Sequence, residues 1–207
     1  MATQTLTRPQ QDQTVEQKIQ ELRENYADAP QYVKTALENA LPSLTSLGAE
    51  AQVSQTESAG RKGARQGKVS EFAIIFPFAK GGAKRLRRLL QMLKGNFQLA
   101  DLVGTVHDMR FVFLDNDTKL LFATAYDGDW DPYIDDFATK IPDALDLLFC
   151  DAVGWPGIRS PKIRDWLVEH QVAAEGWYVA TPNLTVAETL RLGKVGNAVD
   201  ELLDKVG

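Results

Sequence analysis

The chain has 207 residues, which is the length of one domain with an extension. Its net charge is −5 at pH 7 and its pI is near 5.1. Hydrophobic residues make up 44% and charged residues 25%, a composition typical of a soluble protein with a core of its own. The acidic balance argues against a nucleic-acid-binding protein, because such proteins gain affinity by neutralising phosphates.

Residues 1–47 are predicted to form a helical N-terminal arm. The polar start of the chain lacks the apolar core of a signal peptide, and no apolar run approaches the roughly 20 residues of a membrane span, so we expect a cytoplasmic protein without an integral span. One helix begins after Thr14, an N-cap that a glutamine follows three positions on, and a second follows Pro30. Residues 48–68 carry Gly, Ser, Gln and charge without periodicity, which predicts a flexible linker.

Residues 69–207 are predicted to form an α+β domain with a C-terminal helix. In chain order, the expected elements are a strand (71–79), an amphipathic helix (83–93), the two strands of a β-hairpin (106–114 and 119–126), helical segments (130–149, divided at Pro142, and 160–172), a last strand (176–181) and a final helix (185–206). This order, β-α-β-β-α-(α)-β, predicts a ferredoxin-like βαββαβ antiparallel sheet.

The strand over residues 106–114 is apolar on both of its faces. One face carries His107, Met109, Phe111 and Phe113, and the other carries Val106, Asp108, Arg110, Val112 and Leu114. A sheet that is apolar on two sides is buried on two sides. We therefore expect a homodimer through the sheet, or a pocket between two sheets.

Three polar residues, His107, Asp108 and Arg110, interrupt this apolar strand. Each costs about 1–3 kcal/mol if it is buried without a partner. In the functional interpretation, His107 ligates a metal or haem, or acts as an acid/base, while Arg110 holds an anionic group such as a carboxylate. In the structural interpretation, Asp108 and Arg110 pair with each other or with neighbours, and His107 lies at the exposed beginning of the strand.

Other parts of the chain carry only weak signals of chemistry. His170 lies in a polar part of a helix, and no Cys/His spacing resembles a zinc site. The acidic stretch 127–131 lacks the spacing of an EF-hand, and Asp129 or Asp131 is predicted to cap the following helix. The single cysteine, Cys150, excludes an internal disulfide and is predicted to be a buried apolar side chain.

Two stretches of the hairpin region have the form His-x-x-Arg-Phe-Val and Leu-Phe-x-x-x-Tyr-Asp-Gly. They lie within Thr105–Leu114 and Leu120–Trp130, with Tyr133 and Asp135–Phe137 following. In these residues the chain resembles bacterial proteins of the dimeric α+β-barrel superfamily that are related to dye-decolourising haem peroxidases. The chain departs from those peroxidases in lacking their Gly-x-x-Asp-Gly motif and in having one ferredoxin-like unit in place of two.

The resemblance implies a dimeric barrel that binds a hydrophobic acidic ligand, with haem as the leading candidate, and performs peroxidase-like oxidative chemistry. It implies that His107 is the axial ligand or acid/base and that Arg110 is the carboxylate partner. Asp108 is added as a candidate catalytic residue, and Tyr126 as a cofactor contact.

Two further hypotheses belong to other classes. A non-enzymatic assembly protein would dimerise through its sheet and dock partners with the arm of residues 1–47. A cofactor-free enzyme on the same barrel would use Asp108 or Tyr126 as its acid/base.

Overall fold

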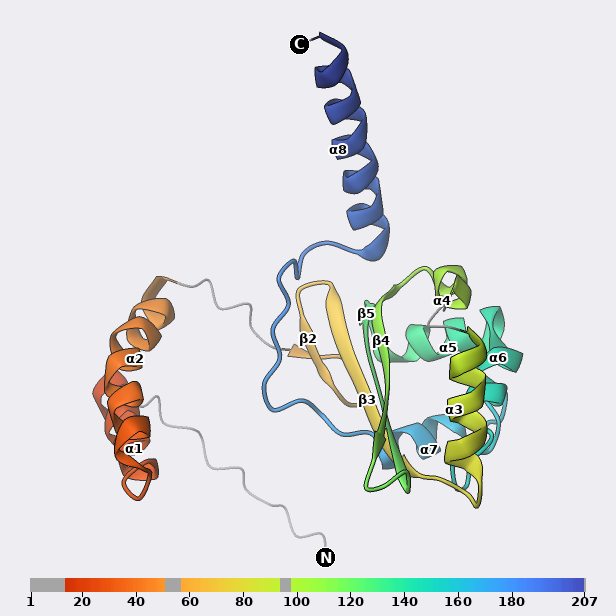
Figure 1. The fold of residues 1–207 in the computed structure, drawn as a ribbon, viewed down its shortest axis with the longest axis horizontal. Coiled ribbons are helices and arrows are strands. Elements are labelled where there is room, and N and C mark those ends of the chain that lie inside the picture. The colour runs from red at the N-terminus through yellow and green to blue at the C-terminus, as the bar shows by residue number, and fades with distance from the viewer. Residues whose placement is uncertain (1–13, 51–56, 94–97, 207) are drawn as a thin grey trace, which may run out of the picture. The chain divides into compact units, whose positions relative to one another are not determined.

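The computed structural model describes residues 14–50, 57–93 and 98–206. The helices and strands are α1 (Val15–Asn25), α2 (Gln31–Glu50), β1 (Glu57–Ser58), β2 (Ala64–Gln66), β3 (Val69–Pro77), α3 (Gly82–Leu93), α4 (Gln98–Val103), β4 (Val106–Leu114), β5 (Lys119–Asp127), α5 (Trp130–Lys140), α6 (Pro142–Phe149), α7 (Ile163–His170) and α8 (Val186–Val206). They give an α+β protein whose described residues form eight helices and one five-stranded sheet (Figure 1). Across that described part of the chain, no helix has both the length and the apolar character needed to cross a membrane.

The chain divides into two compact units, Met1–Val53 and Ser54–Gly207. The first unit is a hairpin of α1 and α2, joined by an ion pair of 2.8 Å between Arg23 and Glu38. The predicted cap of α1 is confirmed: the Gln17 amide donates to Thr14 Oγ1, and the Thr14 amide donates to Gln17 Oε1. This reciprocal capping satisfies two backbone donors that a helix start leaves without intrahelical partners.

The second unit is built on an antiparallel sheet with the strand order β1-β2-β3-β5-β4. The predicted hairpin is confirmed as β4 and β5, with Asp115, Asn116 and Asp117 at positive φ in the turn. β3 pairs with β5 along its whole length. Helices α3, α5, α6 and α7 lie on one side of this sheet (Figure 1).

The core lies between that side of the sheet and the helices. Alternate residues of β3 and β5 point into it, so the strands contribute Phe72, Ile74, Phe76, Leu120, Phe122 and Tyr126. Helix α5 contributes Trp130, Tyr133, Ile134 and Phe137 at helical spacing. Pro142 begins α6, as expected of a proline that cannot continue the preceding helix.

Three expectations differ from the structure. The predicted strand over 176–181 is wrong, because the outer edge of β3 is already taken by β2 and by Gln171, which bridges to Ile74. Part of the predicted linker forms the β1-β2 hairpin. Cys150 is exposed, because α6 turns the preceding Phe149 toward the core and ends there.

Candidate functional site

A β-bulge at the start of β4 sets the geometry of the candidate site. Val106 pairs with Tyr126, and the next residue in register, Asp108, pairs with Ala125, so His107 is the extra residue. A bulge re-aims the side chain that it carries. Simple alternation predicts that His107 lies on the same face of the strand as Met109. Because of the bulge, it does not.

The bulge brings His107 against Asp127, at the end of β5. His107 Nε2 lies 2.7 Å from Asp127 Oδ1, and the two side chains are 22% and 12% exposed. The other carboxylate oxygen of Asp127 accepts a hydrogen bond of 3.0 Å from the Val186 amide, in the first turn of α8. One carboxylate thus joins β4, β5 and α8, and it fixes the orientation of the imidazole.

Asp108 and Arg110 form the pair that the structural interpretation anticipated. Arg110 Nη2 lies 3.4 Å from Asp108 Oδ2, and both side chains are well exposed. Asp108 Oδ1 also accepts a hydrogen bond of 3.1 Å from the Ala125 amide, beside the bulge. Asp108 therefore stabilises the irregular strand pairing. Arg110 is solvated, so its ion pair with Asp108 contributes little to stability.

Tyr126 lies on the opposite face of the sheet from Arg110. Its ring is fully buried and stacks on Tyr133 with 3.7 Å between ring centroids. Burial raises the pKa of Tyr126 and of Tyr133 far above the ordinary value of a phenol, so both remain protonated at neutral pH. Tyr126 is thus a core residue, and the structure does not bring it together with Arg110.

The acidic stretch after β5 binds basic residues of the β1-β2 hairpin. Asp129 occupies the N-cap position of α5, but its carboxylate pairs with Arg65 at 2.5 Å and makes no side-chain cap. Asp131 pairs with Arg61 at 2.9 Å and with Arg164 at 3.0 Å. These carboxylates are engaged in structural ion pairs.

The haem site that the resemblance implies stays a prediction. Neither His107 nor Arg110 lines the cavity of about 120 Å³ between α3, α5 and α6, or the cavity of about 490 Å³ beside α3 and the turn of the hairpin. Arg110 pairs in register with Ala123, whose side chain lies on the face of the sheet away from the helices, so Arg110 also points away from the helices. Among the described residues, no group of three or more His, Cys, Asp or Glu side chains is placed to hold a metal ion.

Sequence reasoning missed Asp127, the residue that organises this site. A regular hairpin around Asp115–Thr118 would place His107 opposite Tyr126 and not beside Asp127. The bulge changes the register by one residue, and no residue type in Val106–Asp108 signals it.

No protein-family model matches the chain, and no curated protein or solved structure is significantly similar to it.

Proposed function

We propose that this protein is a non-enzymatic assembly protein that dimerises through the uncovered face of its sheet. The observation that carries the proposal is the row of apolar side chains on the side of β3, β5 and β4 that faces away from the helices. These residues are Ala73, Ile75, Val112, Leu114, Leu121 and Ala123, all half-buried or exposed.

These apolar residues form one continuous patch. Strand register places Ala73 beside Ala123, and Ile75 beside Leu121, which in turn lies beside Val112. The small side chains at the centre allow a second sheet to approach closely. A contiguous exposed apolar patch with a polar rim is typical of a protein–protein interface.

The polar rim suits a two-fold interface. Asp108 and Arg110 stand at one end of the patch, and they carry opposite charges. In a two-fold dimer each residue meets the same surface of the other copy, so a pair of opposite charges is self-complementary. Two of these antiparallel sheets packed in this way would give a dimer of the kind that the resemblance implies.

The first unit fits a docking role within such an assembly. Helices α1 and α2 form a unit of their own, in which Tyr32 is exposed. A dimer would present two such helical hairpins, and paired docking elements bind a paired partner with increased avidity.

The test is the mass of the full chain in solution across a range of concentrations. Sedimentation should give a dimer, and Val112→Glu should raise the dimer dissociation constant by about tenfold or more, because it buries a charge at the interface. Val153→Glu is the matched control, since Val153 is a similarly exposed valine outside the patch (48% against 42%). A monomer at every concentration would refute the proposal.

Haem binding stays a separate prediction, and it requires a pocket formed between two copies. The pairing of His107 Nε2 with Asp127 favours it, because a carboxylate commonly orients a ligating histidine and leaves its second nitrogen for the metal. Adding haem to the purified chain should then give a saturable Soret band that His107→Ala abolishes and His170→Ala retains. A spectrum identical to that of free haem would end this hypothesis.

A further inference from the structure

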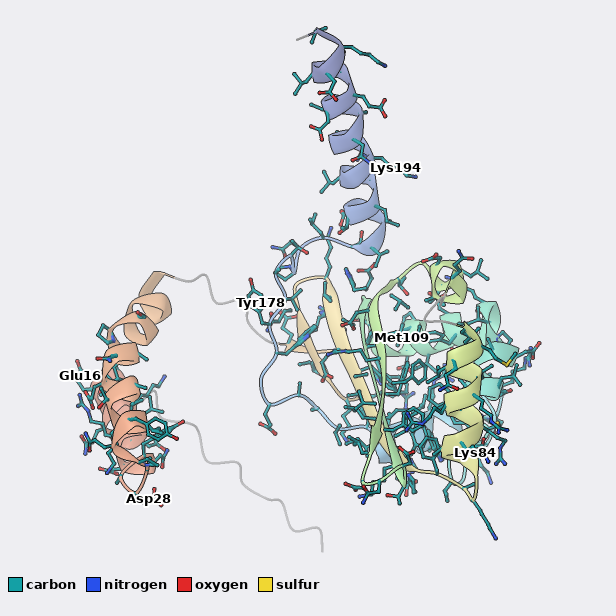
Figure 2. The ribbon with its side chains drawn as sticks, in the orientation of Figure 1. Glu16, Asp28, Lys84, Met109, Tyr178 and Lys194 are labelled. Carbon is teal, nitrogen blue, oxygen red and sulfur yellow. The ribbon has the colours of Figure 1, made fainter. Side chains whose placement is uncertain are left out.

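Helix α8 is a long helix without any buried residue. Its start is well formed: Thr185 and Glu188 cap each other reciprocally, and Lys68 holds the Glu188 carboxylate at 2.7 Å. Beyond this first turn, the apolar side chains of α8 are exposed to solvent. Figure 2 shows side chains projecting from the helix along its length, Lys194 among them.

Five of the seven large exposed apolar residues of α8 follow a heptad repeat, and Leu190 and Leu203 lie outside it. The five are Leu192, Val195, Val199, Leu202 and Val206, which alternate at spacings of three and four residues and are 48% to 74% exposed. Such spacing places all five on one seam, at the a and d positions of a coiled coil. The second heptad has valine at a and leucine at d, the combination that favours two parallel strands, and the first heptad has the reverse, Leu192 at a and Val195 at d.

The composition of α8 indicates that the helix needs a partner. Gly193 and Gly196 lie in its interior with open space around them, and glycine lowers the stability of a helix interior. Helices in proteins gain most of their stability from packing an apolar face, and α8 buries none of its residues.

Charge argues against a membrane surface as that partner. Helix α8 carries four acidic residues and three basic ones, whereas helices that lie on anionic membranes are rich in Lys and Arg on their polar face. The two flanking positions that face each other across a parallel seam, Ala198 at g of the first heptad and Leu203 at e of the second, are uncharged. They therefore allow an identical helix to approach without repulsion between like charges.

We propose that the seam of α8 pairs with the same seam of a second copy, as a short parallel two-stranded coiled coil. This inference rests on the proposed dimer. The seam of 15 residues is about 20 Å long and too short to hold two chains together alone. Asp127 and Lys68 tie the first turn of α8 to the sheet, so a dimer formed by the sheets raises the effective concentration of the two helices.

Disulfide trapping in the full chain tests the pairing and its direction. Each variant carries Cys150→Ser, because the exposed native thiol would form crosslinks of its own. Leu192→Cys and Val199→Cys should give covalent dimers under mild oxidation, about tenfold more than Asn197→Cys, which lies on the opposite side of the helix. An antiparallel pair would instead crosslink Leu192→Cys of one copy to Val206→Cys of another, and this result would overturn the proposal.

A second measurement separates the coiled coil from the dimer itself. Val199→Asp should weaken the dimer by about tenfold or more, because it places a charge in the seam, whereas the matched Asn197→Asp should leave the dimer unchanged. If the wild type is a dimer that neither variant affects, the coiled coil is refuted and the proposed function stands. If the wild type is a monomer, both are refuted.

Discussion

Asp127 is the residue that connects the strands of the hairpin to α8. Its carboxylate accepts from the Val186 amide and contacts His107, and only 12% of the side chain is exposed. Removing an acceptor from a shielded backbone amide costs more than removing an exposed ion pair. The stability of this corner should therefore depend on Asp127 far more than on Arg110.

The first prediction concerns substitutions at Asp127. Asp127→Ala should lower the free energy of unfolding by about 1–3 kcal/mol, because the Val186 amide loses its acceptor. Asp127→Asn retains one carbonyl oxygen and should lose less. Urea unfolding of the two variants beside Arg110→Ala measures the difference, and equal losses for all three would contradict the argument.

The second prediction concerns pH and Glu188. Hydrogen bonds from Lys68 and from the backbone and hydroxyl of Thr185 lower the pKa of Glu188 from 4.5 to about 2. Because the pKa is lower in the folded state, this contribution to stability is complete above pH 4.5 and is lost as the pH falls toward 2.

An NMR titration of the Glu188 carboxyl group should show a midpoint far below the ordinary value. Lys68→Met removes the largest cause and should move that midpoint back toward 4.5. A midpoint near 4.5 in the wild type would show that the cap and the ion pair do not form in solution.

At the scale of elements, replacing glycine by alanine should have opposite effects on stability at two positions. Gly193→Ala should stabilise α8 by about 1 kcal/mol, because an added Cβ meets nothing and alanine favours the helix. Gly104→Ala should destabilise the protein, because Gly104 has a φ of +79° that an alanine adopts only with strain. Helicity and thermal unfolding of the two variants should change in opposite directions.

The elements that sequence predicts well are those whose signal is local. The hairpin of β4 and β5, the strand β3 and helix α5 each show their period in consecutive residues. The β1-β2 hairpin does not, since Arg61 and Arg65 are held by the carboxylates of Asp131 and Asp129, far along the chain. The apolar run at 176–181 predicts a strand in isolation, but whether it pairs depends on which segment already occupies the edge of β3.

The same distinction between local and distant signals applies to the candidate site. That Asp108 and Arg110 pair follows from their positions two apart on one face of a strand. The contact of His107 with Asp127 could not follow from spacing, because it depends on a bulge that shifts the register of the hairpin.

At the scale of the whole molecule, the two units should be separable only at the boundary between Val53 and Ser54. The segment that follows this boundary belongs to the α+β unit. Ala59 is fully buried, its carbonyl accepts a hydrogen bond of 2.8 Å from the Trp130 amide, and its own amide donates to the Gly63 carbonyl. The cation of Arg61 also lies 5.5 Å from the ring of Trp130.

Two truncations therefore have different expected outcomes. A chain of residues 54–207 should unfold at the same urea concentration as the α+β unit within the full chain. A chain of residues 61–207 removes β1 and Ala59, leaves the Trp130 amide without its acceptor, and should lose about 1–3 kcal/mol. Equal midpoints for the two truncated chains would mean that β1 and Ala59 contribute nothing to the unit, and that the ordered domain begins after them.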